Sequence, residues 1–575
     1  MLFVGCVRLR LGYYITAFAL AAAPVSGFAQ AITNPTKLPG AADVQRIDKR
    51  EETPMPPSDL QPTARPLNVM PATAAPEQSK KVYFRLRAVD IENMHAFTNA
   101  EIRDTYADYL DKEISLDIAW LIAAKISERY QAAGYFLSRA YVPQQQIGKD
   151  GVLHIKVIEG YIAEVKLDDG LKDNALVNHW IERLKGRKPI TSDYLESVLL
   201  QINDIPGVGA HATLEPVKQG SYEDGAVRLL LTHEATTGHG SFGFDNDGSK
   251  YLGPYEASAA YQASIIPNEL TSVHFLNTIP WHEMQYGTID QHIAIAPAWF
   301  VDVYGGVTEA FPGYTLKTSD IKSNSVSLGA SLSYQVIRQR QENLLTKLTF
   351  ETRDTHSDIL ELAPLTRDRI RVLRAGLTYE KVDAWQGYDQ LSFTFSQGLG
   401  IMDASQAGDP HLSRAEATPD FRKAEFTFSR SQALDADWGV VTAASGQIAS
   451  GPLYSSEEFG YGGQAFGRAF DSSELVGDHG IDASVEFRYL SLDTSHLGFD
   501  TTPYTFYDGG MVFNNDRTQE KTQMGTSAGL GFRLNTDFGA GANLGVAFPI
   551  GQAISTPIYG GAHDPRYTME FSYGF

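Results

Sequence analysis

Tyr567-Thr-Met-Glu-Phe-Ser-Tyr-Gly-Phe575, at the C-terminal end of the chain, alternates between two kinds of side chain. The odd-numbered positions are large and mostly aromatic, and the even-numbered positions are small or polar. Because alternate side chains of a β-strand point to opposite faces, this stretch predicts a strand with one aromatic face. A soluble domain would have to cover that face, whereas a closed barrel in lipid exposes it. The alternative is an ordinary amphipathic strand.

The first 29 residues have the pattern of a secretory signal peptide. Two arginines precede an apolar stretch over residues 11–25. Small residues then favour cleavage after Ala29, with cleavage after Ala31 as the alternative. Cys6, the only cysteine, precedes the apolar stretch, so the mature chain is expected to contain no disulfide and no cysteine metal site. No later stretch reaches the roughly 18 apolar residues of a spanning helix, so a membrane would be crossed by strands.

Charge and composition limit the classes of function. The formal charge of −21 argues against nucleic acid as a partner. Residues 30–79 are rich in proline, alanine and threonine, which predicts a linker without a packed core. Residues 41–52 contain neither proline nor glycine and predict a short helix within this linker. A solvated, charged segment is the alternative for these twelve positions.

Residues 80–160 have the pattern of a compact α/β unit in the order strand, helix, helix, strand, strand. The first helix is predicted over residues 98–110 and opens with a capping box. Apolar residues at helical spacing predict a second helix that begins at Ser115 and ends at Gly134. The strands are predicted at residues 82–89, 136–142 and 152–158.

Residues 161–235 repeat that order. Helices are predicted at about 173–184 and 191–203, and strands at 161–167, 211–217 and 226–232. The repeat is one of topology and length rather than of residue identity. Two tandem α/β units are therefore expected before residue 236.

Residues 236–575 change character, because helical periodicity largely disappears. Alternating segments recur, among them residues 344–352 and 481–489. At roughly 20 residues for each strand with its connection, this region gives about 17 strands. The prediction is a transmembrane β-barrel of about 16 antiparallel strands, with 14 or 18 left open.

Several short motifs of the first unit occur in a recognisable order. They are Gly134-Tyr135, Ser138-Arg-Ala140, Val142-Pro-Gln-Gln145, Gly151 and Val157-Ile-Glu-Gly160. Together they resemble the POTRA domain of two-partner secretion transporters, the TpsB family of ShlB, FhaC and HecB type. The resemblance implies two periplasmic POTRA domains, residues 80–160 and 161–235, followed by a 16-stranded outer-membrane barrel over residues 236–575.

Two stretches of the barrel region resemble further motifs of this family. Gly462-Gly463-Gln-Ala-Phe-Gly467-Arg468-Ala469-Phe470 resembles the signature Val-Arg-Gly-Tyr/Phe of a loop that folds into the lumen. Gly467 stands in place of the valine and Ala469 in place of the glycine. If the loop tip needs a positive φ at Ala469, the alanine Cβ would strain it.

The second stretch, Phe506-Tyr-Asp508-Gly-Gly510, resembles the family motif Phe-x-Asp-x-Gly. Alternation puts Phe506, Asp508 and Gly510 on one face, and a carboxylate facing lipid would be costly, so Asp508 is expected to point inward. The resemblance implies that Arg468 pairs with Asp508 inside the barrel and pins the loop to its wall. The alternative is that Arg468 is an exposed loop residue.

Three more expectations concern the last residue, the linker and the first α/β unit. Phe575, a terminal aromatic residue, resembles the signal by which outer-membrane barrels are recognised for assembly. The helix predicted at 41–52 resembles the plug of the barrel, with a flexible tail as the alternative. Tyr130, Tyr135 and Phe136 are expected near the substrate-binding surface of the first POTRA domain, although Tyr130 and Phe136 also suit a core position.

The functional hypothesis is an outer-membrane translocator that binds an unfolded partner exoprotein in the periplasm and exports it through the barrel. Its other expected partners are lipid and the barrel assembly machinery, without cofactor or metal. A BamA-like assembly factor is the main alternative, and a plain porin or adhesin leaves the two α/β units unexplained.

Two candidate metal-binding motifs in the sequence are incomplete. His282-Glu283 lacks the second histidine of a zinc helix motif. Asp245-Asn-Asp247-Gly248 resembles part of a calcium loop but lacks the later glutamate, so it predicts a turn. We therefore predict a protein that is not an enzyme.

Overall fold

The structure, a computed structural model, describes residues 38–47, 75–217, 222–234, 238–279, 282–360, 363–492, 494–516, 520–554, 557 and 560–575, apart from the side chains of Gln45 and Ser495. The predicted signal peptide, residues 1–29, and most of the predicted linker lie outside these residues. None of the helices within them is both long and apolar enough to cross a membrane.

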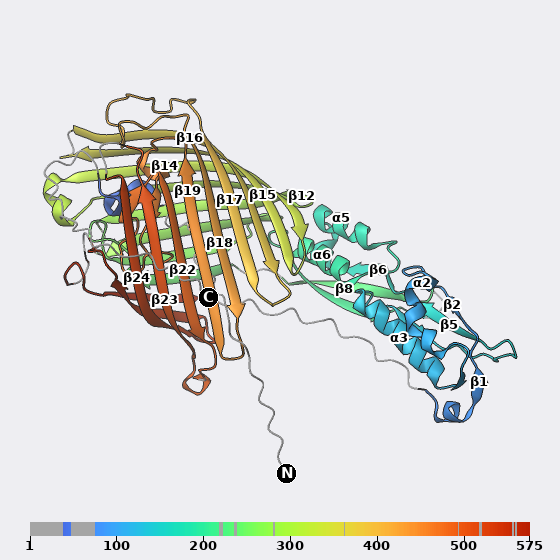
Figure 1. Cartoon of the computed structure of the whole chain (residues 1–575). Coiled ribbons are helices and arrows are strands. Elements are labelled where there is room, and N and C mark those ends of the chain that lie inside the picture. Colours follow the sequence, from blue (N-terminus) through green and yellow to red (C-terminus); the bar gives the residue numbers. More distant parts are fainter. Residues whose placement is uncertain are drawn as a thin grey trace, which may run out of the picture.

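The C-terminal region forms one closed antiparallel barrel of 16 strands, as the sequence predicts (Figure 1). Each wall strand pairs with its neighbours along the chain, and β26 pairs with β9 to close the cylinder. A short hairpin of β20 (Phe459–Tyr461) and β21 (Leu475–Gly477) belongs to the loop between β19 and β22 and forms its own two-stranded sheet. The wall strands are β9 (His239–Asp245), β10 (Tyr255–Ala263), β11 (Glu269–Ile279), β12 (Met284–Ala296), β13 (Trp299–Ala310), β14 (Ile321–Arg338), β15 (Glu342–Ile359), β16 (Ala363–Val382), β17 (Tyr388–Gly398), β18 (Arg422–Ala433), β19 (Trp438–Ala449), β22 (His479–Tyr489), β23 (Asp500–Phe513), β24 (Thr522–Asn535), β25 (Ala540–Pro549) and β26 (Arg566–Gly574).

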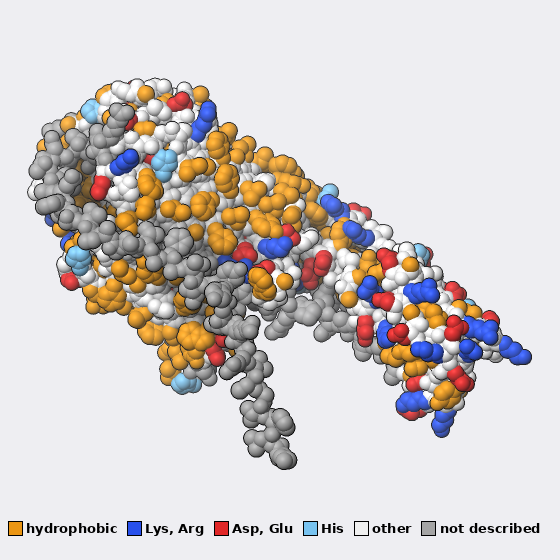
Figure 2. All heavy atoms as spheres, in the orientation of Figure 1, with side chains coloured by type: hydrophobic (Ala, Val, Ile, Leu, Met, Phe, Trp, Pro, Cys, Tyr) orange, Lys and Arg blue, Asp and Glu red, His pale blue; other side chains and the backbone are white. Residues whose placement is uncertain are grey.

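Alternation of side chains explains why these strands close in lipid. Large apolar side chains such as Leu328 and Phe393 are exposed on the outer wall. Figure 2 shows apolar side chains gathered over the barrel, whereas charged side chains gather on the α/β arm. In the last strand Tyr567 and Phe571 are exposed, while Glu570 lines a cavity in the lumen. The alternating side chains that predict the barrel therefore face lipid and lumen in turn.

The first α/β unit contains a three-stranded sheet in the order β2-β5-β4, with β2 parallel and β4 antiparallel to β5. Its longest helix, α3, supplies several buried apolar side chains of the core. The elements are β1 (Tyr83–Arg85), β2 (Ala88–Glu92), α2 (Asn99–Ile102), β3 (Glu113–Ser115), α3 (Ile118–Ala132), β4 (Arg139–Tyr141) and β5 (Val152–Ile158).

Three sequence predictions for this unit were wrong in detail. The strand predicted at 82–89 is two strands, because β1 pairs with β3 whereas β2 pairs with β5. The helix predicted at 98–110 has its capping box, but it is α-helical only to Ile102 and continues as 3-10 turns. Ser115 does not begin the second helix, since it pairs with Tyr83 as the last residue of β3.

The second α/β unit has the same sheet topology, in the order β6-β8-β7, with β6 parallel and β7 antiparallel to β8. Asn174 and Thr191 cap its two longer helices by accepting hydrogen bonds from the first turn. The elements are β6 (Tyr161–Leu167), α4 (Asp169–Lys172), α5 (Ala175–Leu184), α6 (Ser192–Asn203), β7 (Gly209–Pro216) and β8 (Ala226–Glu234).

The second unit docks on the short turns at one end of the barrel. Arg338, at the end of β14, donates two hydrogen bonds of 2.6 and 2.7 Å to the carboxylate of Asp204. The neighbouring Arg340 donates to Glu196 at 2.9 Å. These contacts define a proximal end beside the α/β units. The long loops 399–421 and 450–478 leave the wall at the opposite, distal end.

Candidate functional site

Two segments of the chain lie inside the barrel towards its distal end. One is the luminal loop, residues 450–478 between β19 and β22. The other is the N-terminal segment, residues 38–47, drawn in blue within the barrel in Figure 1. A cavity of about 540 Å³ is lined by the wall, by the luminal loop and by Arg46 of the N-terminal segment. The candidate functional site is this partly filled lumen.

Arg468, at the tip of the luminal loop, reaches the barrel wall. Its Nη1 donates to Glu486 on β22 at 2.7 Å, and its Nη2 donates to the hydroxyl of Ser484 at 3.4 Å. The guanidinium also lies over the ring of Phe506, 4.0 Å from the ring centre. The side chain is largely buried, so it is not an exposed loop residue.

Asp508 on β23 contacts the same loop tip. Its Oδ2 accepts a hydrogen bond from the backbone N–H of Arg468 at 3.2 Å, and lies 3.6 Å from Nε of that arginine. Asp508 is completely buried and points inward, as alternation predicts. The structure thus brings Arg468 and Asp508 together, but the shorter side-chain contact of Arg468 is with Glu486.

The backbone of the loop tip places its glycines where the sequence requires them. Positive φ angles of 117°, 104° and 77° fall on Gly462, Gly463 and Gly467, and Ala469 has none. The strain considered for Ala469 therefore does not arise, because the left-handed position lies two residues earlier. Gly510 has a different constraint: a Cβ there would meet the ring of Tyr461 at 2.2 Å. Phe470, next to this ring, is fully buried.

Glu486 is the functional candidate that the sequence motifs missed. Besides Arg468, it accepts hydrogen bonds from Arg488 at 2.8 Å and Arg533 at 2.6 Å. One buried carboxylate therefore compensates three guanidinium groups. Alternation over residues 481–489 already placed Glu486 on the polar face, but alternation alone does not say which carboxylate an incoming arginine meets.

A second anchor holds the other arm of the luminal loop. Glu457 accepts a hydrogen bond from Arg374 on β16 at 2.7 Å and pairs with Lys423 on β18 at 2.7 Å. Its polarity is the reverse of that at Arg468, because here the loop supplies the carboxylate and the wall supplies the cations. The loop is thus held to two separate parts of the wall.

The N-terminal segment is held by both apolar and polar contacts. Leu38, Val44 and Ile47 are buried in a cluster with side chains from β11, β12 and the distal loops. Arg46 donates to the backbone carbonyls of Ser455 at 2.7 Å and Glu458 at 3.1 Å. The hydroxyl of Ser455 donates in turn to the carboxylate of Asp43. The described part of the segment consists mainly of 3-10 turns, at Gly40–Ala42 and Val44–Arg46, rather than the predicted α-helix.

Three aromatic residues of the first α/β unit were predicted near a substrate-binding surface. Tyr130 on α3 is completely buried, and its hydroxyl donates to Glu159 at 2.7 Å, so its prediction as a surface contact was wrong. The helical spacing that singled it out is the spacing of the core. Tyr135 and Phe136, after the helix, are only partly buried, and Phe136 packs against the core of the second unit.

Glu159 is a buried carboxylate held by several donors. Oε1 accepts from the backbone N–H groups of His95 and Ala96, both at 2.8 Å, as well as from Tyr130. Burial alone would raise the pKa of Glu159, but the hydrogen bonds from His95, Ala96 and Tyr130 outweigh it and lower the pKa below its ordinary value. This carboxylate therefore stabilises the unit in its ionised form.

The lowered pKa of Glu159 predicts a pH-dependent stability. Its contribution is complete above the unfolded pKa of about 4.3 and is lost as the pH falls through the lower folded pKa. Glu159→Gln should remove this acid dependence and cost about 1–3 kcal/mol at neutral pH. Pulse proteolysis of the full-length chain in detergent, scored by cleavage within residues 80–160, measures both effects. An unchanged acid profile in the variant would contradict the assignment.

Gln145 and Ser138, from the motifs of the first unit, also have structural roles. The side-chain amide of Gln145 donates to the carbonyl of His154 at 2.7 Å and accepts from its N–H at 2.9 Å. It thus completes the edge of β5 where β4 has ended. Ser138 accepts from the N–H of Gly160 at 3.1 Å. These motifs stabilise the unit rather than present side chains to a ligand.

Among the described residues, one group of three side chains is close enough to hold a metal ion: Asp90, Glu92 and His154. It lies on the sheet of the first unit. Lys156 already pairs with Glu92 at 3.0 Å, and His154 with Asp90 at 3.0 Å. Each of the three side chains thus already has a polar partner within the sheet.

Comparison with known proteins gives consistent results. The model of the family described as haemolysin secretion/activation protein ShlB/FhaC/HecB matches residues 226–532, and that of the ShlB-type POTRA domain matches residues 84–160. The heme/hemopexin transporter protein HuxB of Haemophilus influenzae (strain 86-028NP) is 25% identical over 529 residues, 85% of this chain and 89% of its own.

Solved structures resemble the whole fold. CdiB from Escherichia coli has a TM-score of 0.65 at 16% identity, covering 88% of this chain and 94% of its own. BamA from Haemophilus ducreyi lacking POTRA domains 1-3 has a TM-score of 0.51 at 11% identity, covering 86% of this chain and 100% of its own. At these identities the likeness shows the fold alone.

Proposed function

The chain belongs to the ShlB/FhaC/HecB family of haemolysin secretion/activation proteins, and we propose from this premise how it carries its partner across the outer membrane. It is an outer-membrane translocator of two-partner secretion, with its POTRA domains in the periplasm. Its partner is a secreted TpsA-like exoprotein, recognised unfolded and exported through the barrel. The proximal end of the barrel therefore faces the periplasm, and the distal end faces the outside.

Recognition is proposed to occur at the open sheet edges of the POTRA domains, residues 80–160 and 161–235. Within the described residues, β4 and β7 each have a strand partner on one side only. An extended segment adds to such an edge through main-chain hydrogen bonds, with side-chain pockets giving selectivity. Tyr135 and Phe136 lie a few residues before β4 and remain proposed contacts, whereas Tyr130 does not.

Passage of the exoprotein through the barrel is proposed to require movement of the luminal loop and of the N-terminal segment. The observation that supports this is the double anchoring of the luminal loop, through Arg468 and through Glu457, beside the buried N-terminal segment. Release of the Arg468 contacts would free the loop from β22 and β23, and departure of residues 38–47 would open the distal end. The predicted signal peptide, residues 1–29, would deliver the chain to the periplasm beforehand.

The proposal is tested by co-expressing the full-length chain with candidate exoproteins. The partner should appear in the culture medium only when both are present, and an exoprotein without its N-terminal segment should stay in the cell. If instead the medium stays empty and other outer-membrane barrels fail to assemble without this chain, the assembly-factor alternative replaces the proposal.

Phe575 is proposed as the residue that the barrel assembly machinery recognises, and it also closes the barrel. Its N–H and carbonyl both bond to Gly240 at 2.9 Å, and its ring stacks on Phe242 with centres 5.5 Å apart. The seam between β26 and β9 comprises only five paired positions, so losing its terminal residue matters.

Deletion of Phe575 should lower the amount of folded protein in the outer membrane. The deletion removes two seam hydrogen bonds and one outward-facing ring. The measurement is the heat-modifiable fraction on gels of isolated outer membranes. Phe548→Ala, which removes an exposed ring from β25 away from the terminus, is the control. Equal losses in the two variants would contradict a special role for the terminal residue.

A further inference from the structure

The N-terminal segment occupies a site with a defined chemistry. Arg46 is almost completely buried, and its guanidinium donates to the backbone carbonyls of Ser455 and Glu458. Burial lowers the pKa of this guanidinium, and the nearby carboxylates of Glu458 and Asp43 offset that effect only in part. The luminal loop thus forms a cradle of two main-chain oxygens around this guanidinium, beside the carboxylate of Glu458, which also pairs with the buried Arg414 at 3.2 Å.

Next to this cradle lies an apolar surface. Leu38, Val44 and Ile47 contact it, and it is formed by Tyr251, Leu252, Leu276, Met284, Tyr286, Ala310, Leu316 and Ile321. These residues come from the distal loops and from the adjoining ends of β11 to β14. The site therefore accepts a short peptide in which apolar side chains stand close to one basic side chain.

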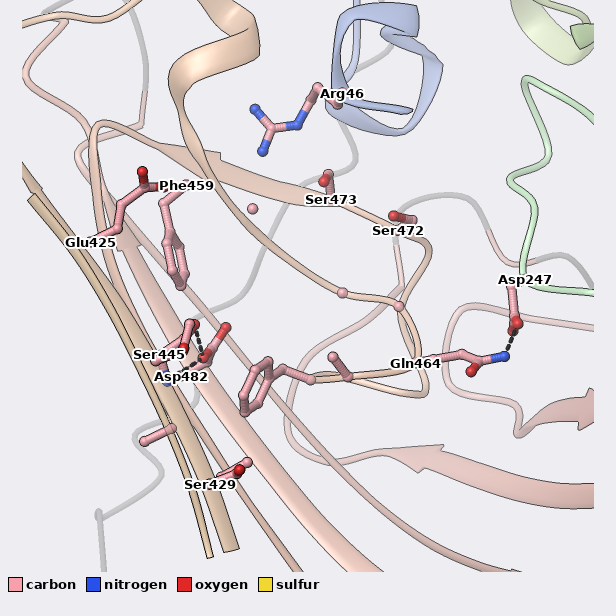
Figure 3. A pocket seen from close by; sticks show the side chains of 18 of the residues that line it. Arg46, Asp247, Glu425, Ser429, Ser445, Phe459, Gln464, Ser472, Ser473 and Asp482 are labelled. Carbon is pink, nitrogen blue, oxygen red and sulfur yellow. Dashed lines mark hydrogen bonds between the residues drawn. The ribbon is translucent and has the colours of Figure 1, made fainter. Parts of the chain in front are cut away.

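The cavity beside the cradle is lined by more acidic than basic side chains. Its lining contains six carboxylates, and Arg46 is its one guanidinium among the described residues. Figure 3 shows Arg46 projecting from the N-terminal segment, with Glu425 and Asp482 on the barrel wall. The six are Asp245, Asp247, Glu256, Glu425, Asp482 and Glu570. A basic side chain that enters this cavity meets a favourable field before it reaches the cradle.

A plug that only fills space would not need this cradle. Moving an arginine out of water is expensive, and a buried ion pair is often no more stable than an apolar replacement of the same volume. The structure nevertheless buries Arg46 and places main-chain acceptors at both of its terminal nitrogens. Such matching is expected of a binding site whose ligand carries a cation.

We propose that the distal mouth is a binding site for a segment of the exported polypeptide in which an arginine or lysine stands among apolar residues, and that residues 38–47 occupy it until export begins. This inference rests on the proposed export function, to which it adds the class of polypeptide segment that the distal mouth of the barrel binds. The exported segment replaces Arg46 in the cradle and Val44 and its neighbours on the apolar surface.

The test uses the full-length chain with residues 38–47 deleted, reconstituted in planar lipid bilayers. The probe is a synthetic peptide with the sequence of Leu38–Ile47, added on the distal side. We expect this peptide to reduce the single-channel current. The peptide with Arg46→Ala should need a concentration at least about tenfold higher for the same block, which corresponds to a loss of about 1.4 kcal/mol in binding free energy. The peptide with Arg46→Lys should block with intermediate potency.

Glu458→Gln in the deleted chain provides the matched control on the protein side. It should weaken the block by the arginine peptide and leave that by the alanine peptide unchanged. Equal potency of the arginine and alanine peptides, or no block by either, overturns the inference, and this comparison needs no protein variant beyond the deletion. Discrimination between the peptides in a chain that secretes no exoprotein would reject the proposed function instead and leave the binding site standing.

Discussion

Glu486→Ala is expected to reduce secretion of the partner exoprotein by at least about tenfold, since removing one partner from a buried ion pair costs about 3–5 kcal/mol and somewhat less in a wet lumen. Glu486 accepts hydrogen bonds from Arg468, Arg488 and Arg533. Without it, three guanidinium groups of the lumen lose their shared carboxylate and repel one another. The luminal loop then keeps only the weaker contact of Arg468 with Ser484 on β22. The measurement is exoprotein in the medium, normalised to folded barrel in the outer membrane.

Asp508→Asn should have a smaller effect than Glu486→Ala. Asp508 accepts from the backbone N–H of Arg468 and lies farther from its side chain, at 3.6 Å. An asparagine oxygen can still accept that backbone hydrogen bond. Exchanging the charges of Arg468 and Asp508 should not restore secretion, because Arg468→Asp places a carboxylate against Glu486.

Glu342→Gln is the matched control, because Glu342 lies at the start of β15 near the proximal turns, where Tyr379 donates to it. It should secrete at the normal level. Normal secretion by Glu486→Ala together with complete loss in Asp508→Asn would reverse the ranking and make Asp508 the principal partner of Arg468.

Much of the fold follows from local pattern, because lipid on one side and water on the other impose strict alternation on every strand. This is why the strand from Tyr567 to Phe575 suffices to indicate a barrel. The predicted helix and strand boundaries that were wrong are those set by pairing between residues distant in the sequence. Ser115 has helix-compatible neighbours, yet it lies in β3 because Tyr83, 32 positions earlier, pairs with it.

The candidate site, like the fold, could be predicted from the sequence only in part. Sequence motifs singled out Arg468 and Asp508, and the structure brings them together. Glu486 could be assigned to the inner face by alternation, but its meeting with Arg468 depends on the register that puts Glu486 opposite Phe506 and on the fold of the luminal loop. The prediction for Tyr130 was wrong for a related reason. Helical spacing does not distinguish an aromatic residue of the core from one that contacts a ligand.

Deletion of residues 38–47 is expected to raise the single-channel conductance of the barrel several-fold. Their buried side chains fill the distal end together with the luminal loop, and the cavity beside them is only about 540 Å³. Arg46→Ala should act differently from the deletion. It removes the two hydrogen bonds to Ser455 and Glu458 but leaves the apolar contacts, so openings should become more frequent while their amplitude stays below that of the deleted chain.

Planar-bilayer recordings of the detergent-purified full-length chain separate these two effects, because amplitude reports what blocks the lumen and frequency reports how firmly it is held. Arg340→Ala, which affects only the contact with Glu196 at the proximal end, should change neither. Unchanged conductance after deletion would mean that the luminal loop closes the barrel by itself. In that case Glu457→Gln, which releases Arg374 and Lys423 from the second anchor, should produce the large openings that the deletion fails to give.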